Sequence, residues 1–231
     1  MLPPALNLNV KRHGQRVPAV GWLPGSPRAI VLAGHGGSGH KQSAGILAIA
    51  SAFHQRGIAV LAIDGPVHGE RRPDGSADPA VAKEAFRSAW RQGTGHLSMA
   101  QDFSCALEAL CTQEGLHDLP VGYIGVSMGT AYGIPLLAAE PRISVAAIGL
   151  WSAAYPRSEH LLEHARRIRC RVWFTQQWHD EIIDRAGAAD LFDAIGSSDK
   201  RLVAYPGGHR ELEGERLADA VRFVAESLVR A

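Results

Sequence analysis

The sequence has few cysteines, no long apolar run and almost no net charge. Its three cysteines, Cys105, Cys111 and Cys170, form an odd set without C-x-x-C spacing, which argues against a disulfide framework and against a cysteine-based zinc site. The longest apolar runs reach about half of the roughly 20 residues needed to cross a bilayer. The 231 residues carry 24 Lys and Arg against 23 Asp and Glu, so the charge balance predicts neither nucleic acid nor an anionic membrane as a partner.

Secretory and repeat signatures are also missing. Residues 1–17, MLPPALNLNVKRHGQRV, contain no basic segment followed by an apolar one, so we expect a cytoplasmic location. The chain has no internal repeat and no low-complexity segment. Its length suits one large α/β domain, which we expect to cover residues 1–231. The sequence leaves the oligomeric state open, with a homodimer as one option.

What the sequence does contain is a regular alternation of short apolar runs and segments with helical spacing. Two extended pieces, 6–10 and 16–23, flank a predicted turn that carries Gly14. Strands buried on both faces that alternate with helices predict an α/β fold. We therefore expect a mostly parallel eight-stranded sheet with an antiparallel N-terminal hairpin and helices on both faces. The six remaining predicted strands are 28–33, 58–63, 121–126, 145–150, 171–175 and 201–205.

Residues 69–98 interrupt this alternation. They form a polar stretch with Pro and Gly near its start, and they enclose a short amphipathic piece that contains Phe86 and Trp90. The segment is longer than an ordinary connection between elements. It is either a lid or arm over a site, or a surface excursion packed on the rim.

The loop GHGGSGHKQS, residues 34–43, follows an apolar strand and matches parts of three motifs. Its G-x-G-x-x-G pattern is typical of a dinucleotide-binding turn, but Asp64 lies 25 residues after Gly39 (64 − 39) instead of about 20 from the motif. A phosphate-binding loop needs Gly-Lys-Ser/Thr, whereas His40 separates Gly39 from Lys41. The third interpretation is that the loop stabilises negative charge that develops during a reaction.

A second motif favours that third interpretation. Gly125 to Gly129 read G-V-S-M-G between an apolar strand and a helix rich in small residues. G-x-S-x-G at a strand-to-helix turn holds a serine in a strained, exposed position that suits a nucleophile. The alternative is that Ser127 merely caps the helix.

A serine nucleophile requires a base and an orienting acid later in the chain. His209 follows a Pro-Gly-Gly loop after the last predicted strand, where an imidazole can reach over the sheet toward Ser127. The loop after the preceding strand offers three carboxylates, Asp180, Glu181 and Asp184. We favour Asp180 because it comes soonest after the strand, while Asp184 is positioned as the N-cap of a helix that begins at 185.

The segments GHGGSGHK, DGPVHGER, GVSMG, WHDEII and GGHRE occur in this order. In them the chain resembles the α/β-hydrolase fold superfamily, and within it the small bacterial serine esterases related to dienelactone hydrolases and to prolyl oligopeptidase-like hydrolases. The resemblance covers nearly the whole chain. It implies an oxyanion hole built from the backbone N–H groups of Gly37 and Met128. Dienelactone hydrolases use a cysteine nucleophile where this chain has Ser127, so the resemblance does not extend to their substrate.

The sequence therefore predicts a serine hydrolase that cleaves a small-molecule carboxylic ester through an acyl-enzyme, without a metal or other cofactor. Trp90, Trp151 and Trp178 are candidates for the substrate pocket, although aromatic core packing explains each of them equally well. A thioesterase, amidase, acyltransferase or peptidase would use the same residues. Two alternatives from other classes are a non-catalytic protein that binds a small molecule and a nicotinamide-dependent oxidoreductase that uses the G-x-G-x-x-G loop.

Overall fold

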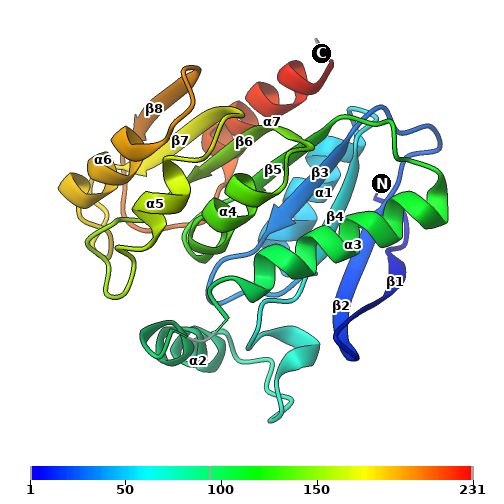
Figure 1. The fold of residues 1–231 in the computed structure, drawn as a ribbon, viewed down its shortest axis with the longest axis horizontal. Coiled ribbons are helices and arrows are strands. Elements are labelled where there is room, and N and C mark those ends of the chain that lie inside the picture. The colour runs from blue at the N-terminus through cyan, green and yellow to red at the C-terminus, as the bar shows by residue number, and fades with distance from the viewer. Residues whose placement is uncertain (1, 94, 230–231) are drawn as a thin grey trace.

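The computed structural model describes residues 2–93 and 95–229 and contains an eight-stranded sheet in the order β1-β2-β4-β3-β5-β6-β7-β8 (Figure 1). The β1/β2 and β2/β4 pairs are antiparallel, and every other pair is parallel. The predicted α/β class, the eight strands and the antiparallel hairpin are confirmed. The strands are β1 Leu6–Arg12, β2 Gln15–Trp22, β3 Ile30–Gly34, β4 Ala59–Ile63, β5 Val121–Gly125, β6 Ile143–Gly149, β7 Arg171–Gln177 and β8 Lys200–Tyr205.

The N-terminal hairpin turns on two residues that both have positive φ. His13 has φ 49° and Gly14 has φ 77°, and Arg12 pairs directly with Gln15. Two-residue hairpin turns of this kind need positive φ at both central positions, which Gly14 supplies without strain. The turn sets the register that pairs Val10 with Val17.

Helices cover both faces of the sheet, as predicted. Helices α3 to α6 lie on one face, and α1 and α7 lie on the other (Figure 1). Helix α5 has only five residues, too few for a periodic pattern to show in the sequence. Among the described residues, no helix is both long and apolar enough to cross a bilayer. The helices are α1 Ala44–His54, α2 Pro79–Arg91, α3 Ser98–Glu114, α4 Met128–Ala139, α5 Leu161–Ala165, α6 Arg185–Ala194 and α7 Gly214–Val229, and a 3₁₀ turn, η1, spans Gly69–Arg71.

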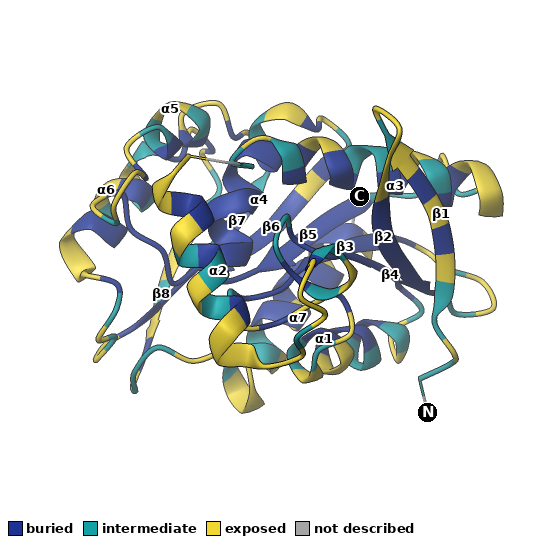
Figure 2. Ribbon diagram, turned by 90° about the horizontal axis from the view of Figure 1, so that it is seen from below, coloured by how far each residue is buried: buried dark blue, intermediate teal, exposed yellow. Residues whose placement is uncertain are grey.

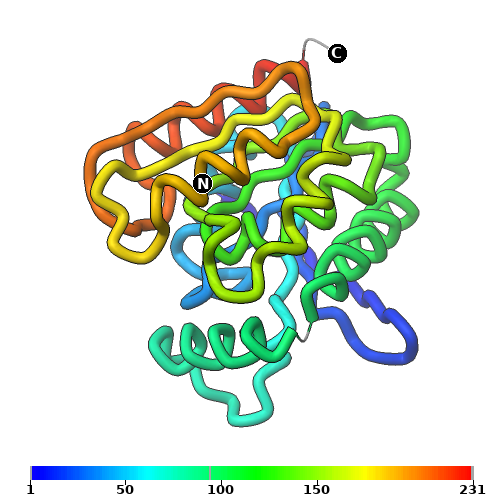
Figure 3. Tube along the Cα trace, turned by 60° about the vertical axis from the view of Figure 1, so that its left-hand side comes forward, coloured from blue at the N-terminus to red at the C-terminus, as the bar shows by residue number. Residues whose placement is uncertain are grey.

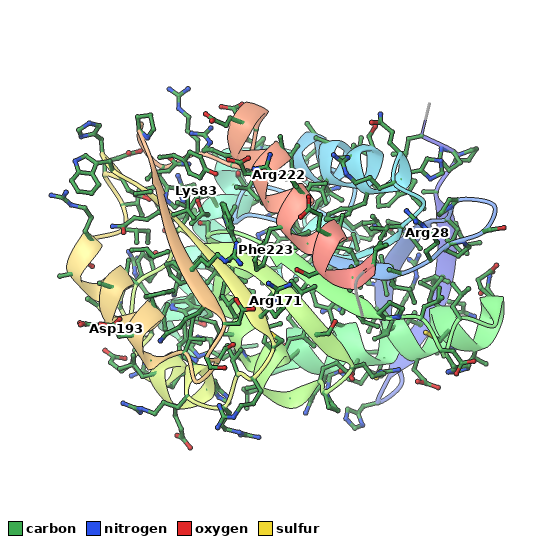
Figure 4. All side chains as sticks on the ribbon, turned by 90° about the horizontal axis from the view of Figure 1, so that it is seen from above. Arg28, Lys83, Arg171, Asp193, Arg222 and Phe223 are labelled. Carbon is green, nitrogen blue, oxygen red and sulfur yellow. The ribbon has the colours of Figure 1, made fainter. Side chains whose placement is uncertain are left out.

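The C-terminal helix α7 packs on the sheet through the face that its apolar spacing predicts. Val221 and Val224 are fully buried. The ring of Phe223 lies under the guanidinium group of Arg171 from β7, at 5.5 Å (Figure 4), and under that of Arg201 from β8, at 5.3 Å. These contacts tie the last helix to the last two strands. The loop that carries His209 joins β8 to α7, so they also fix the two ends of that loop.

The carboxyl ends of the six parallel strands meet at one edge of the sheet, which is where open α/β sheets place their ligand sites. Residues 69–98, which we call the arm, connect β4 to α3 and protrude from the rest of the structure (Figure 3). Helix α2 of the arm crosses in front of the strand ends and exposes its outer face (Figure 2). Asp78 caps this helix by accepting a hydrogen bond from the N–H of Ala80. Residue 94 of the arm lies outside the described residues.

Candidate active site

Ser127 occupies a strained turn between β5 and α4. Its φ of 56° and ψ of −121° are rare for a residue with a side chain, and such strain persists only where the surroundings enforce it. The neighbouring glycines allow the close approach that the turn needs. A Cβ atom on Gly129 would lie 2.7 Å from the backbone oxygen of Gly34, and one on Gly125 would lie 2.7 Å from the hydroxyl of Tyr123. The G-x-S-x-G spacing therefore reflects packing as well as chemistry.

Ser127, His209 and Asp180 form one continuous chain of hydrogen bonds. The Oγ atom of Ser127 lies 2.9 Å from Nε2 of His209, and Nδ1 of the same imidazole lies 2.8 Å from Oδ2 of Asp180. The three residues follow β5, β8 and β7 respectively, so the common edge of the sheet brings them together. With Nδ1 donating to the carboxylate, Nε2 is free to accept the proton of the serine hydroxyl.

Asp180 is the carboxylate that contacts the imidazole of His209, and the neighbouring carboxylates make other contacts. The second carboxylate oxygen of Asp180 accepts the N–H groups of Ile182 and Ile183, each at 2.9 Å. Burial raises the pKa of Asp180, but the hydrogen bonds from His209 and from the two N–H groups outweigh it and hold the pKa below its usual value. Asp180 is therefore a carboxylate at neutral pH.

The other two carboxylates of this loop support the backbone. Asp184 accepts the N–H of Gly187 at 2.6 Å and is the N-cap of α6, as predicted. Glu181 accepts the backbone N–H of His209 at 2.9 Å, a contact that sequence spacing did not reveal. It anchors the histidine loop without touching the imidazole.

Two buried histidines fix the loop after β3. The Nδ1 atom of His35 lies 2.8 Å from the carbonyl oxygen of Gly36, and its Nε2 accepts the N–H of Gly65 at 3.0 Å, so the proton belongs on Nδ1. The held carbonyl and the N–H of Gly37 belong to one trans peptide and point in opposite directions. That N–H is thus turned away from His35. The N–H of Met128 belongs to the first residue of α4, where an intrahelical partner is missing by geometry.

His68 braces the next peptide of the same loop. Its Nε2 lies 3.0 Å from the carbonyl oxygen of Gly37, and its ring meets that of His35 edge-on. Burial lowers the pKa of His68, and burial together with the neighbouring His68 lowers the pKa of His35 well below its usual value. Both imidazoles are therefore uncharged at neutral pH, and they support the loop after β3 through hydrogen bonds.

Lys41 and Asp64 form a buried ion pair behind this loop. The ammonium group lies 2.9 Å from Oδ2 of Asp64 and 2.5 Å from Glu70. Asp64 also accepts the N–H groups of Lys41 and Glu70 and is fully buried. In a dinucleotide-binding motif, Asp64 would bind a ribose, but here its carboxylate is occupied by Lys41 and two backbone N–H groups. In a phosphate-binding loop, Lys41 would bind phosphate, but here its ammonium group is paired with Asp64 and Glu70.

Replacing Lys41 with Met should destabilise the fold by about 3–5 kcal/mol, because Asp64 would remain buried without its counter-charge. Urea unfolding with linear extrapolation measures the change. Lys11→Met is the matched control, since Lys11 is exposed on β1, and it should stay within about 0.5 kcal/mol of the unchanged chain. A loss below about 1 kcal/mol for Lys41→Met would show that the pair does not hold the loop.

A pocket of about 140 Å³ opens beside Ser127 and His209. Trp151 lines it as predicted, buried and held by a hydrogen bond from its Nε1 to the hydroxyl of Ser158. Tyr155 lies against Trp151 with ring centroids 4.4 Å apart. The remaining lining residues are Gly36, Gly37, Ser38, Lys83, Phe86, Arg87, Val126, Ile182, Arg210 and Glu211.

Two of the three predicted pocket tryptophans are placed elsewhere. Trp90 is fully buried, donates its indole N–H to the carbonyl of Pro156 at 3.0 Å and packs behind Trp151. Phe86, one helical turn earlier, faces the pocket in its place. Trp178 is 52% exposed and stacks under the guanidinium of Arg185, away from the pocket lining. Both corrections have the same cause. The sequence shows that a residue is aromatic, but only the packing of the folded chain shows whether its ring faces the pocket, the core or the solvent.

Side chains that can bind a metal do not converge elsewhere in the described chain. No group of three or more His, Cys, Asp or Glu side chains lies close enough to hold an ion among residues 2–93 and 95–229. All three cysteines are free thiols.

Neither a scan against protein-family models nor a search of curated proteins gave a match. Solved structures do match. A PEG-bound cold-adapted esterase from an Arctic intertidal metagenomic library is 36% identical over 97% of this chain and 93% of its own, with a TM-score of 0.85. A zinc-bound cold-adapted esterase from such a library is 32% identical over 97% and 92%, with a TM-score of 0.79. Dienelactone hydrolase from Anabaena variabilis shares the fold, at 18% identity over 100% and 99% and a TM-score of 0.74.

The sheet order, the strained serine turn and these similarities define the class to which the protein belongs: it is a hydrolase of the α/β fold. The chain belongs to the α/β-hydrolase superfamily. The family resemblance seen in the sequence motifs is confirmed.

Proposed function

We propose that the protein is a serine carboxylic ester hydrolase with Ser127 as nucleophile, His209 as general base and Asp180 as the acid that orients it. The observation that carries the proposal is the unbroken hydrogen-bond chain from Ser127 through His209 to Asp180, at a strained turn beside the fixed loop after β3. The esterases at 36% and 32% identity support the same chemistry.

The reaction begins when Oγ of Ser127 attacks the ester carbonyl and its proton passes to Nε2 of His209. The tetrahedral intermediate places its negative oxygen at the N–H groups of Gly37 and Met128, and each such donor contributes about 2.7–4 kcal/mol to lowering the barrier. His209 then gives the proton to the departing alcohol, which leaves an acyl group on Ser127. Water, deprotonated by His209, releases the acid and restores the serine.

The pocket supports a small acyl group. Its volume of about 140 Å³ is below the roughly 300–1,000 Å³ of sites for drug-sized ligands. Phe86, Trp151 and Ile182 give it apolar walls. Acetyl and butyryl esters are therefore the substrates of choice, and long acyl chains should be poor ones.

Intact-mass spectrometry after incubation with a fluorophosphonate tests the proposal. The unchanged chain should gain a single phosphonyl group, Ser127→Ala should gain none, and His209→Ala should react far more slowly. p-Nitrophenyl acetate and butyrate should be hydrolysed faster than the palmitate. A folded chain that forms no adduct would overturn the mechanism and favour a protein that only binds its ligand.

A further inference from the structure

The rim of the pocket carries positive charge that the described residues leave largely unpaired. Lys83 and Arg87 lie one turn apart on α2, on either side of Phe86, and Arg210 directly follows His209. All three line the pocket. Glu211 is the only acidic residue among its described lining residues.

The two arginines of the arm that precede α2 form close ion pairs, which distinguishes them from the cations of α2. Arg71 pairs with the buried Asp102 at 2.8 Å, and Arg72 pairs with Asp74. By contrast, Lys83 and Arg210 form no ion pair with any acid of the described chain, and Arg87 meets only Glu84, at 3.7 Å. Glu84 is 66% exposed, and such surface pairs contribute little.

Glu211 cancels only part of this charge. Its carboxyl group is tucked against Gly36 and Gly45, so closely that a Cβ atom on either glycine would contact it. Desolvation there, with the neighbouring Glu213, raises the pKa of Glu211. The pocket therefore presents three cations against one acid, in a chain whose formal net charge is only +1.

We infer that the protein prefers esters that carry an anionic group, a carboxylate in particular, which Lys83 and Arg87 of α2 bind at the pocket rim. The inference rests on the proposed function and names the substrate class of the same site. Both side chains are half-buried, so an anion seated between them is screened less than at an open surface. The apolar walls hold the uncharged part of the substrate while the two cations select the charged part.

Two pairs of esters, each matched in reacting group, test the inference and show which side of the scissile bond carries the charge. 4-Acetoxybenzoate against its methyl ester places the anion on the leaving group, and p-nitrophenyl hemisuccinate against p-nitrophenyl butyrate places it on the acyl group. The rate without enzyme is subtracted for every ester, because the carboxylate of the hemisuccinate also attacks its own ester. We expect kcat/KM to favour the anionic member of one pair by about tenfold, as two partly exposed charge pairs provide. The preference should shrink as salt is raised from low to high concentration.

The double variant Lys83→Gln and Arg87→Gln should bring the ratio of anionic to neutral kcat/KM close to one. Arg91→Gln is the matched control, because Arg91 is an exposed cation of the same helix that does not line the pocket, and it should leave the ratio unchanged. A ratio that survives in the double variant would overturn the assignment to α2.

The outcomes separate this inference from the proposed function. If the unchanged chain hydrolyses neutral esters and reacts with the fluorophosphonate but shows no anionic preference in either pair, the inference fails and the esterase proposal stands. If no ester is hydrolysed and no adduct forms, the esterase proposal fails and the inference fails with it.

Discussion

Ser127→Ala should lower kcat/KM for p-nitrophenyl acetate by about 10⁴- to 10⁶-fold, because a methyl group can form no acyl-enzyme and only the oxyanion donors and binding remain. The fold should persist. Ala has the same backbone constraints as Ser at φ 56°. Removing the hydroxyl group costs the protein one hydrogen bond, the one to His209. Initial rates of the purified variant measure the loss of kcat/KM, and its far-UV circular dichroism spectrum shows whether the fold persists.

The matched control is Ser51→Ala on helix α1, which removes a hydroxyl remote from the strand ends. It should keep the activity of the unchanged chain within about twofold, because Ser51 is a half-buried residue outside the pocket lining. If Ser127→Ala retained a tenth or more of the activity, another residue would have to be the nucleophile, and the assignment would be wrong.

Asp180→Asn should lower kcat by about 10⁴-fold, through the tautomer of the histidine. The oxygen that accepts the N–H groups of Ile182 and Ile183 must remain an oxygen, so the amide NH₂ takes the place of Oδ2 and points its donors at Nδ1 of His209. Nδ1 must then accept, which puts the proton on Nε2. An imidazole that already holds a proton there cannot take the one from Ser127.

Glu181→Gln is the control for this variant. The amide oxygen of Gln can still accept the backbone N–H of His209, so kcat should change by no more than about threefold. The pair also separates the neighbouring carboxylates of the loop by experiment. Equal losses in both variants would mean that the loop, and not the tautomer, controls activity.

The predictable parts of the site are those set by local sequence. Ser127 stands out because its turn needs small neighbours on both sides, so the glycines that mark it in the sequence are the same ones that pack against Gly34 and Tyr123. His209 stands out because it is close to the last strand in a Pro-Gly-Gly loop. Both lie where the sequence places them, and the hydrogen bond between them links residues 82 positions apart.

The parts that could not be predicted depend on which way a side chain points. Phe86 and Trp90 lie on the same amphipathic stretch, and nothing in their spacing shows that Phe86 faces the pocket while Trp90 lies behind it. The contact of Asp180 with the imidazole follows from its place just after β7, but the path of the chain that brings Glu181 to the backbone N–H of His209 could not be read from the sequence.

The sequence by itself determined the class of fold, the number and approximate positions of the strands, and the candidate nucleophile and base, because hydrophobic period and turn chemistry are local properties. Tertiary structure alone decided the sheet order, the contact of Glu181 with the backbone of His209, which aromatic rings border the pocket, and which cations lie beside it. These features join α2, the loop after β7 and the loop after β8, which are distant in sequence. Their relation exists only once the six parallel strands bring their carboxyl ends to one edge.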